Sequence, residues 1–190
     1  ETTGFTISGD GGGFGQSVGK AGDVNGDGYD DLIVGAYSGQ GAAYVIYGNG
    51  TKSLKDIALA SQTLEPGKTG FKMTGNSNSF GVSVSRAGDV NGDGYDDVIV
   101  GAHTNNSFQG AAYVIFGNIT SSLKNWAFTF EALDPSTGFS ISGDGGLFGF
   151  SVSTAGDINN DGYADIIIGA RDKMNLQGAV YVIHSGNFFL

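Results

Sequence analysis

At residues 23–31 the chain reads Asp23-Val24-Asn25-Gly26-Asp27-Gly28-Tyr29-Asp30-Asp31, and the apolar run Leu32-Ile33-Val34-Gly35-Ala36 follows at once. The same two blocks return at Asp89 to Asp97 and at Asp157 to Asp165, so successive copies start 66 and 68 residues apart. A Phe-Gly pair precedes each copy, and a Gly-Ala-Ala-Tyr or Gly-Ala-Val-Tyr block follows it. Blocks that recur three times in one order indicate three internal repeats, approximately residues 4–69, 70–137 and 138–190.

Each repeat contains four short runs that are typical of β-strands. In the first repeat, Phe5 to Ile7 alternates apolar and polar residues, whereas Asp31 to Ala36 is almost wholly apolar, as suits a strand buried on both faces. Phe14 to Ala21 and the β-branched and aromatic run Ala42 to Tyr47 supply the other two strands. Four strands per repeat predict an all-β fold of propeller blades, because a β-sandwich needs no such repeat and solenoid coils are usually much shorter.

Two longer connectors, roughly residues 49–69 and 118–137, take up the difference in repeat length. Insertions of this kind are tolerated in surface connections. Within the connectors we expect a short helix at Ser53 to Leu59 and another at Ser121 to Lys124.

The composition limits the class of protein to which the chain can belong. Its 190 residues are enough for one domain with a core, it has no cysteine, and its 35 glycines do not recur at every third position as in collagen. No apolar run approaches the ~18 residues of a membrane span. The net charge of −10 argues against a nucleic-acid partner, since phosphate binding needs clustered Lys and Arg.

Three N-glycosylation sequons, which begin at Asn49, Asn105 and Asn118, favour an extracellular glycoprotein, either secreted or at the cell surface. Such tripeptides also arise by chance in chains rich in Asn and Ser. The chain opens at Glu1 without a signal peptide, as a processed product or an excised fragment would.

The three Asp-rich stretches contain eleven of the 19 acidic residues of the chain and are the candidate metal-binding segments. In the first stretch, oxygen donors stand at positions 1, 3, 5 and 9, and the backbone carbonyl of Tyr29 at position 7 adds a fifth. Calcium takes six to eight oxygen ligands, and Gly28 permits the sharp turn that a short loop needs to wrap the ion. The pattern predicts about three Ca²⁺ ions, one per repeat, held by Asp23, Asn25, Asp27, Tyr29, Asp31, Asp89, Asn91, Asp93, Tyr95, Asp97, Asp157, Asn159, Asp161, Tyr163 and Asp165.

The third stretch decides which acidic residue closes the loop. Its position 8 is Ala164, where the other two have Asp30 and Asp96, whereas position 9 is Asp in all three. We therefore interpret position 9 as the ligand and position 8 as a solvated spare. An EF-hand is excluded, because it needs Glu at position 12 and flanking helices, and position 12 here lies inside an apolar run. Two alternatives stay open, namely magnesium and a turn without metal, although crowded carboxylates repel one another when no cation is present.

With Phe14-Gly15, the stretch Asp23 to Asp31 and Gly35-Ala36 in this order, the chain resembles the FG-GAP repeat, which is found in the β-propeller of integrin α subunits. The resemblance spans nearly the whole chain, but the proline that follows Gly-Ala in the family is replaced in all three repeats. The resemblance implies that the calcium loop joins the first two strands of a blade. It also implies that each repeat is offset from its blade, so that the last blade lacks an outer strand and Phe5 to Ile7 is an outer strand without a blade.

Three blades are too few to close a propeller, since known propellers have about four or more. We therefore expect the chain to be part of a longer propeller or to be completed by assembly. Two copies would give a six-bladed ring, and donation of the first strand from each copy to the next would give a head-to-tail fibre.

These features favour a calcium-binding extracellular module for adhesion, scaffolding or ligand binding, in which calcium is structural and the partner is a protein or a glycan. The alternatives are an accessory propeller of a secreted hydrolase, a glycan-binding lectin and a subunit of an extracellular fibre. No enzyme is expected, because His103 and His184 lie at unrelated repeat positions and the Asp loops leave no open position for metal catalysis. Trp126 and Phe108 are candidate ligand contacts, although we favour packing beneath a connector for both.

Overall fold

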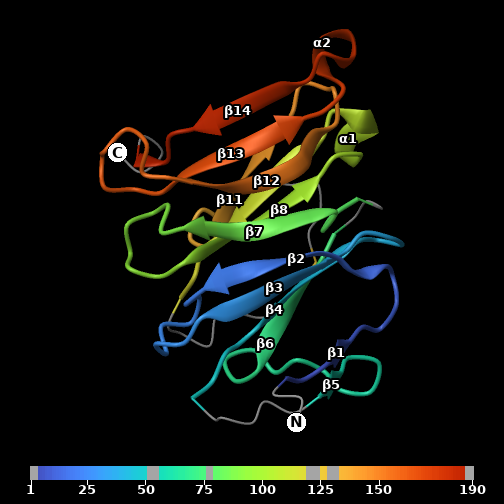
Figure 1. Cartoon of the computed structure of the whole chain (residues 1–190), viewed down its shortest axis with the longest axis vertical. Helices are drawn as coiled ribbons and strands as arrows, with labels where there is room; N and C mark the ends of the chain where they lie inside the picture. The colour runs from blue at the N-terminus through green and yellow to red at the C-terminus, as the bar shows by residue number, and fades with distance from the viewer. Residues whose placement is uncertain (1–3, 51–55, 76–78, 119–124, 128–132, 187–190) are drawn as a thin grey trace.

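The computed structural model of the chain describes residues 4–50, 56–75, 79–118, 125–127 and 133–186. Strands dominate these residues and their helices are short, so the predicted all-β fold is confirmed. Three antiparallel sheets are stacked as layers, with the N-terminal segment at one end of the stack and the third repeat at the other (Figure 1).

The first sheet has five strands, of which the four antiparallel ones form blade 1 and come from two repeats. β2 (Phe14–Gly22), β3 (Asp31–Ala36) and β4 (Ala42–Ile46) come from the first repeat. The outer strand, β6 (Gly70–Thr74), opens the second repeat and pairs antiparallel with β4. The two-residue strand β10 (Trp126–Ala127) extends this sheet by pairing in parallel with β6.

Blades 2 and 3 have the same strand order as blade 1, with four strands in blade 2 and three in the described part of blade 3. Blade 2 consists of β7 (Ser83–Gly88), β8 (Asp97–Ala102), β9 (Ala111–Ile115) and the outer strand β11 (Gly138–Ser142), which opens the third repeat. Blade 3 consists of β12 (Phe148–Gly156), β13 (Asp165–Ala170) and β14 (Ala179–Ile183). The offset between repeat and blade is confirmed, because β6 and β11 of one repeat complete the blade of the repeat before it.

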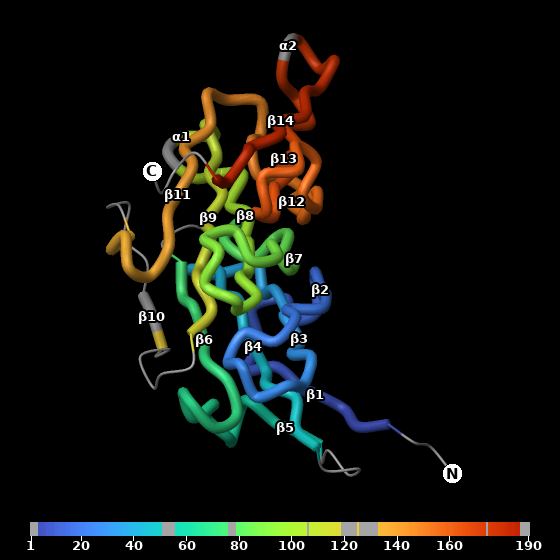
Figure 2. The backbone as a smooth tube through the Cα atoms, turned by 90° about the vertical axis from the view of Figure 1, so that its left-hand side faces the viewer, coloured from blue at the N-terminus to red at the C-terminus, as the bar shows by residue number. Residues whose placement is uncertain are grey.

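The N-terminal segment joins none of these three sheets. β1 (Ile7–Ser8) instead pairs in parallel with β5 (Ile57–Ala58) in the first connector (Figure 2). The prediction of a helix at Ser53 to Leu59 is therefore wrong over the residues of β5, because they form a strand in which the Ile57 NH donates to the Thr6 carbonyl. Residues 51–55 and the second expected helix, at 121–124, lie outside the described residues.

Two one-turn helices follow the second strand of blades 2 and 3, where the sequence predicted none. They are α1 (Asn105–Phe108) and α2 (Lys173–Leu176), and each ends on a residue with positive φ. Phe108 is 62% exposed, so its predicted packing beneath a connector is wrong. Trp126 lies in β10, and its side chain is outside the described part of the structure.

The hydrophobic core lies between the blades. Val98 and Val100 of β8 pack in one cluster with Ile33 of blade 1, whereas Ile99 packs in a second cluster with Ile166 of blade 3. Because side chains alternate along a strand, β8 contributes to both clusters, and all six of its residues are buried. This two-sided cover explains why the run reads as continuously apolar.

The Phe-Gly pair lies where one blade passes close to the blade before it. A Cβ at Gly81 would collide with the carbonyl of Ala42 in blade 1, and a Cβ at Gly149 would collide with the carbonyl of Ala111 in blade 2. Both glycines also have φ above +80°. Close approach and backbone conformation therefore require glycine at this position.

Candidate metal centre

The three Asp loops connect the first two strands of each blade. Residues 23–30 join β2 to β3, residues 89–96 join β7 to β8, and residues 157–164 join β12 to β13. The loops lie on one side of the stack, with α1 and α2 on the opposite side (Figure 1). Strands flank all three loops and position 12 lies within a strand, so the exclusion of an EF-hand is confirmed.

Each loop folds its polar side chains back onto its own backbone. The carboxylate of Asp23 accepts hydrogen bonds from the NH groups of Asp27 (3.0 Å) and Gly28 (2.8 Å). Asn25 accepts from the Asp27 NH at 3.0 Å, and Asp27 accepts from the Tyr29 NH at 2.9 Å. The same bonds recur in the second and third loops. The side chains at positions 1, 3 and 5 are therefore turned toward the loop in every repeat.

Position 6 is glycine because the backbone demands it. Its φ is +87° at Gly28, +89° at Gly94 and +91° at Gly162, a conformation that side-chain-bearing residues rarely adopt. The near-identity of the three angles indicates one loop conformation built three times.

Position 9 lies at the base of the loop and is fully buried in all three repeats. The Asp31 carboxylate accepts the Val24 NH at 2.9 Å and the Gly48 NH at 2.8 Å. Asp97 and Asp165 accept the corresponding pairs of NH groups. Each of these aspartates therefore ties the start of the loop to the segment that leaves the third strand.

The three buried carboxylates differ in their pKa values. Burial raises the pKa of Asp31 to about 7 and that of Asp97 to about 8, against the lowering effect of their backbone hydrogen bonds. Negative charges at positions 1 and 5 contribute to the raised pKa of both carboxyl groups. At Asp165, burial also raises the pKa, but hydrogen bonds from the Ile158 NH, the His184 ring and the Ser185 NH lower it below its usual value. His184 Nδ1 lies 3.2 Å from this carboxylate, so the third loop has an imidazole neighbour of its own.

The two aspartates at position 8, Asp30 and Asp96, lie in different surroundings. Asp30 is exposed and pairs with Lys20 at 3.0 Å, which agrees with a solvated spare. For Asp96 that interpretation is wrong, because its carboxylate accepts the NH of Asp23 in the preceding loop at 2.9 Å and the Nε of Arg86 at 2.7 Å. Asp96 therefore clamps blade 2 to the Asp loop of blade 1. The sequence could not reveal this contact, because its partners are 73 residues apart.

The loops offer the right donor atoms but do not yet form a cage. Among the described residues, no three acidic or imidazole groups are gathered as a metal cluster. In the first loop, the Asn25 Nδ2 donates to the Asp27 Oδ2 at 3.0 Å. A cation bound between the Asn25 amide oxygen and this Asp27 oxygen would have to break that hydrogen bond. The donor set itself fits a hard cation, since each loop supplies carboxylate, amide and carbonyl oxygens without nitrogen or sulfur donors.

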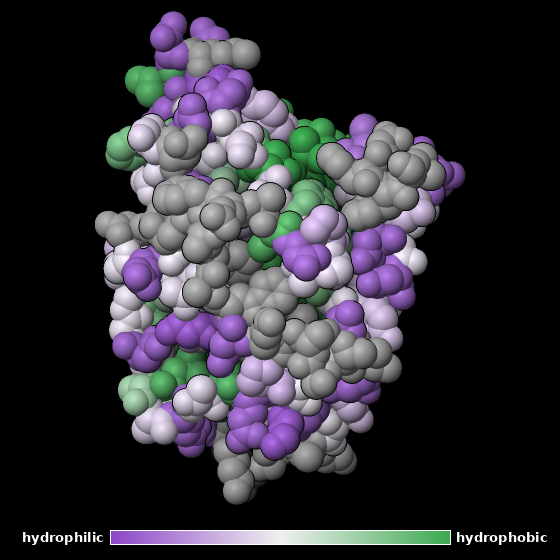
Figure 3. Space-filling view, turned by 180° about the vertical axis from the view of Figure 1, so that it is seen from behind, coloured by the Kyte–Doolittle hydropathy of each residue, from purple (hydrophilic) through white to green (hydrophobic). Residues whose placement is uncertain are grey.

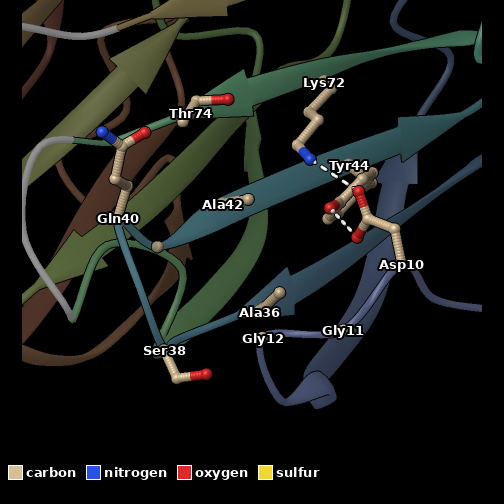
Figure 4. Close-up of a pocket in the computed structure, with 11 residues that line it drawn as sticks. Asp10, Gly11, Gly12, Ala36, Ser38, Gln40, Ala42, Tyr44, Lys72 and Thr74 are labelled. Carbon is tan, nitrogen blue, oxygen red and sulfur yellow. Dashed lines mark hydrogen bonds and ion pairs between the residues drawn. The ribbon is translucent and has the colours of Figure 1, made fainter. Parts of the chain in front are cut away.

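A second polar cluster, on the side opposite the Asp loops, escaped the sequence analysis. The Tyr44 hydroxyl donates to Asp10 at 2.6 Å, and the Lys72 ammonium lies 2.8 Å from the same carboxylate and over the tyrosine ring (Figure 4). These residues line a pocket of about 240 Å³. Burial raises the pKa of Asp10, but the bonds to Lys72 and Tyr44 outweigh this effect and leave the pKa lowered. The three groups satisfy one another and bind the chain before β2 to blade 1.

This tyrosine clamp recurs in the other blades with different partners. The Tyr181 hydroxyl donates to Asp144, which also pairs with Lys173, while the Asn105 amide donates to the Tyr113 hydroxyl at 2.7 Å. The repeated Gly-Asp-Gly-Gly at residues 9–12 and 143–146 was the signal that could have revealed it. Asn105 is also a sequon residue, and its burial makes it a poor glycan acceptor compared with the exposed Asn49.

A model of the FG-GAP repeat matches the chain three times, over residues 14–46, 80–115 and 148–183. The chain belongs to the FG-GAP repeat family. Each match begins at the Phe-Gly pair and ends with the third strand of a blade, so the family pattern covers the inner strands and the Asp loop. The outer strands β6 and β11 lie outside the matched windows.

The FG-GAP chain is also similar over most of its length to integrin α subunits. It is 34% identical to integrin alpha ina-1 of Caenorhabditis elegans over 89% of this chain, and 30% identical to human integrin alpha-IIb over 83%. It is 29% identical to integrin alpha-4 of Xenopus laevis, also over 83%. The chain spans only 14–16% of the length of these relatives. In its described part, no helix has the length and apolar character needed to cross a bilayer.

Proposed function

We propose that the chain is a calcium-stabilised extracellular β-propeller module that binds a protein or glycan ligand in adhesion or scaffolding. The observation that carries the proposal is the triple repetition of one loop conformation with an all-oxygen donor set. Its integrin α relatives support an adhesive, cell-surface role in preference to catalysis.

Calcium has a structural role in this proposal. One ion per loop would be held by the side chains at positions 1, 3, 5 and 9 and by the tyrosine carbonyl at position 7. When bound, the ion neutralises carboxylates that otherwise repel one another. The buried aspartate already holds the loop to the exit of the third strand, as Asp31 does through the Val24 and Gly48 NH groups. A cation on this aspartate would therefore stiffen the corner between neighbouring strands.

Calorimetric titration with calcium tests the proposal, with thermal unfolding followed before and after chelation. We expect about three calcium ions per chain and a lower melting temperature in chelator, because a ligand that binds only the folded state stabilises it. Magnesium at the same concentration is the control, since it demands stricter octahedral geometry and should stabilise less. No uptake of calcium and an unchanged melting temperature would overturn the metal proposal.

The ligand class needs a separate experiment. A glycan array and a binding screen against extracellular matrix proteins, both in calcium, distinguish a lectin from a protein-binding adhesion module. A panel of glycoside and ester substrates tests the alternative of a hydrolase accessory domain. Turnover that persists in the purified chain would contradict the adhesive role.

A further inference from the structure

The contacts between neighbouring Asp loops join specific polar groups of successive blades. They lie inside the stack, between blades that both belong to this chain, so they do not depend on where the sequence begins or ends. The outer surface is less specific where it is seen from behind the stack, because small apolar patches there lie among hydrophilic residues (Figure 3). We therefore follow the contacts between the loops.

Blade 2 holds the backbone of Asp23, the first residue of the Asp loop in blade 1. The Asp23 NH donates to the Asp96 carboxylate at 2.9 Å, and the Asp96 NH donates to the Asp23 carbonyl at 3.2 Å. Asp96 also packs closely on Gly22, where a Cβ would collide with its carboxylate. This reciprocal pair of hydrogen bonds fixes the backbone from which the Asp23 side chain starts.

A second link joins the next residue, Val24, to the same blade. The Val24 carbonyl accepts the Asn118 NH at 2.9 Å, and the Val24 NH donates to Asp31 at position 9 of its own loop. In blade 2, Gly117 precedes Asn118 and donates its NH to Asp97, which is position 9 of the second loop. Hydrogen bonds and peptide units therefore run without a break from the base of one Asp loop to the base of the next.

The interface between blades 2 and 3 has the backbone contact but not the carboxylate. The Ala164 NH donates to the Asp89 carbonyl at 2.9 Å, as the Asp96 NH does to the Asp23 carbonyl. Ala164 also packs on a glycine, Gly88. Because alanine has no side-chain acceptor, position 8 of the third loop cannot hold the Asp89 NH as Asp96 holds the Asp23 NH.

The shape of the first loop depends on Asp23. The Asp23 carboxylate accepts the NH groups of Asp27 and Gly28, so the side chain at position 1 fixes the turn that carries position 5. In the proposed function this carboxylate is also a calcium ligand. A residue that fixes the Asp23 backbone therefore acts on the metal site without touching the ion. Residues that orient a metal ligand in this way typically change metal affinity by about 10–100-fold.

The position of Asp96 favours an effect through its hydrogen bond over an effect through its charge. Arg86 donates from Nε to the Asp96 carboxylate at 2.7 Å, which balances the negative charge. The Asp96 side chain is only 15% exposed, whereas that of Asp30, at position 8 of the first loop, is 63% exposed. Asp30 therefore offers a matched control, since its removal takes the same charge from the first loop itself.

We propose that Asp96 of blade 2 is a positioning residue for the metal site of the first loop, which reaches its full affinity only when blade 2 packs on blade 1. The inference rests on the proposed function, because it takes calcium as the ion. The second loop faces Ala164 and lacks this support. Calcium binding in the first loop and packing of the two blades should then strengthen each other, since a coupling between two equilibria acts in both directions.

NMR titration with calcium tests the proposal, because each loop contains its own reporter. The NH groups of Gly28, Gly94 and Gly162 at position 6 each donate to the carboxylate at position 1 of their loop. In Asp96→Ala, we expect the calcium dissociation constant to rise about tenfold at Gly28 and to stay unchanged at Gly162. The variant should fold, because alanine already occupies this position in the third loop.

Two further measurements separate positioning from charge and from calcium itself. Asp30→Ala should leave the dissociation constant at Gly28 nearly unchanged, and a loss equal to that of Asp96→Ala would overturn the proposal in favour of charge. Hydrogen exchange of the Asp23 NH, followed in chelator, should be faster in Asp96→Ala than in the native chain. Unchanged exchange would mean that Asp96 does not hold this NH and would also overturn the proposal.

The reciprocal variant builds the contact at the second interface. Thr154 corresponds to Arg86, so Thr154→Arg combined with Ala164→Asp supplies both members of the pair from blade 3. We expect a lower calcium dissociation constant at Gly94, because the new carboxylate can accept the Asp89 NH.

The titration also distinguishes failure of this inference from failure of the metal proposal. If no loop takes up calcium, both are overturned. If all three loops take up calcium and Asp96→Ala leaves the dissociation constant at Gly28 unchanged, only the positioning role is overturned. A larger change at Gly94 than at Gly28 would likewise overturn it, because Asp96 would then serve its own loop.

Discussion

Blades 2 and 3 have nearly the same sequence pattern but different surroundings. All five residues of β9 in blade 2 are buried, whereas β14, its counterpart in blade 3, alternates between exposed and half-buried residues. Blade 2 has a neighbour on both faces and blade 3 has one. The difference shows that an apolar strand in this fold is made for two neighbours, and that position in the stack decides how much each residue stabilises.

The largest contrast is expected from one substitution made in both blades. Ile99→Ala leaves a cavity between blades 2 and 3 and should cost about 4 kcal/mol in the free energy of unfolding. Ile167→Ala, at the matching position on the open face of blade 3, should cost about 1 kcal/mol, because little apolar area is lost. Urea denaturation of the two variants, beside the native chain, measures both losses. Equal losses would mean that Ile167 is covered in the folded chain as fully as Ile99.

A smaller contrast is expected between the Asp loops of the same two blades. In calcium at about 100 times its dissociation constant, loss of one site should cost about 2.7 kcal/mol for either Asp89→Ala or Asp157→Ala. The loss should be larger at Asp89, because loosening of that loop also disturbs the 2.9 Å hydrogen bond that the Asp89 backbone carbonyl accepts from the Ala164 NH of blade 3. Thermal unfolding in calcium and in chelator separates the two contributions. If each variant lost as much stability in chelator as in calcium, the result would count against a metal at these positions.

The hydrogen bond from the Val152 NH of blade 3 to the Ser83 hydroxyl of blade 2 gives a third comparison. Ser83→Ala removes the acceptor of the Val152 NH and should cost about 1 kcal/mol, because a part-buried donor is left without its partner. Ser151→Ala, at the end of the stack, should change stability by less than about 0.5 kcal/mol. Urea denaturation resolves this difference when the two variants are measured side by side. A cost at Ser151 as large as at Ser83 would mean that the bond to the Val152 NH does not explain the Ser83 effect.

The smallest contrast concerns the two basic partners of position 8. Arg86→Ala should cost at most about 1 kcal/mol, because Arg86 orients a carboxylate that also accepts the Asp23 NH. Lys20→Ala should have no measurable effect, since both members of its ion pair are exposed. Raising the salt concentration should reduce the Arg86 effect. An Arg86 effect that persists at high salt would point to packing in place of charge.

The repeats, the strands and the Asp loops could be predicted because their signals are local. Alternation in Phe5 to Ile7, the apolar run after Asp31 and the glycine at position 6 each report on a few neighbouring residues. The one-turn helices gave no such signal, and β5 was predicted to be helical because its partner β1 is about 50 residues away. The candidate metal ligands came from spacing alone, and both these ligands and the calcium that they would hold stay predictions.

The offset between repeat and blade was implied by the resemblance to the FG-GAP repeat, and by itself the sequence determined the strands of the blade and the conformation of its Asp loop. These features depend on backbone preferences and side-chain alternation within short segments. Only the tertiary structure decided which residues lie between blades, since those contacts join residues 67 to 73 positions apart. It showed that Asp96 accepts the Asp23 NH of the preceding loop, that β1 pairs with β5, and that Val18 and Val180 are exposed. Burial depends on which blade stacks against which face, and a pattern shared by all three repeats cannot encode that order.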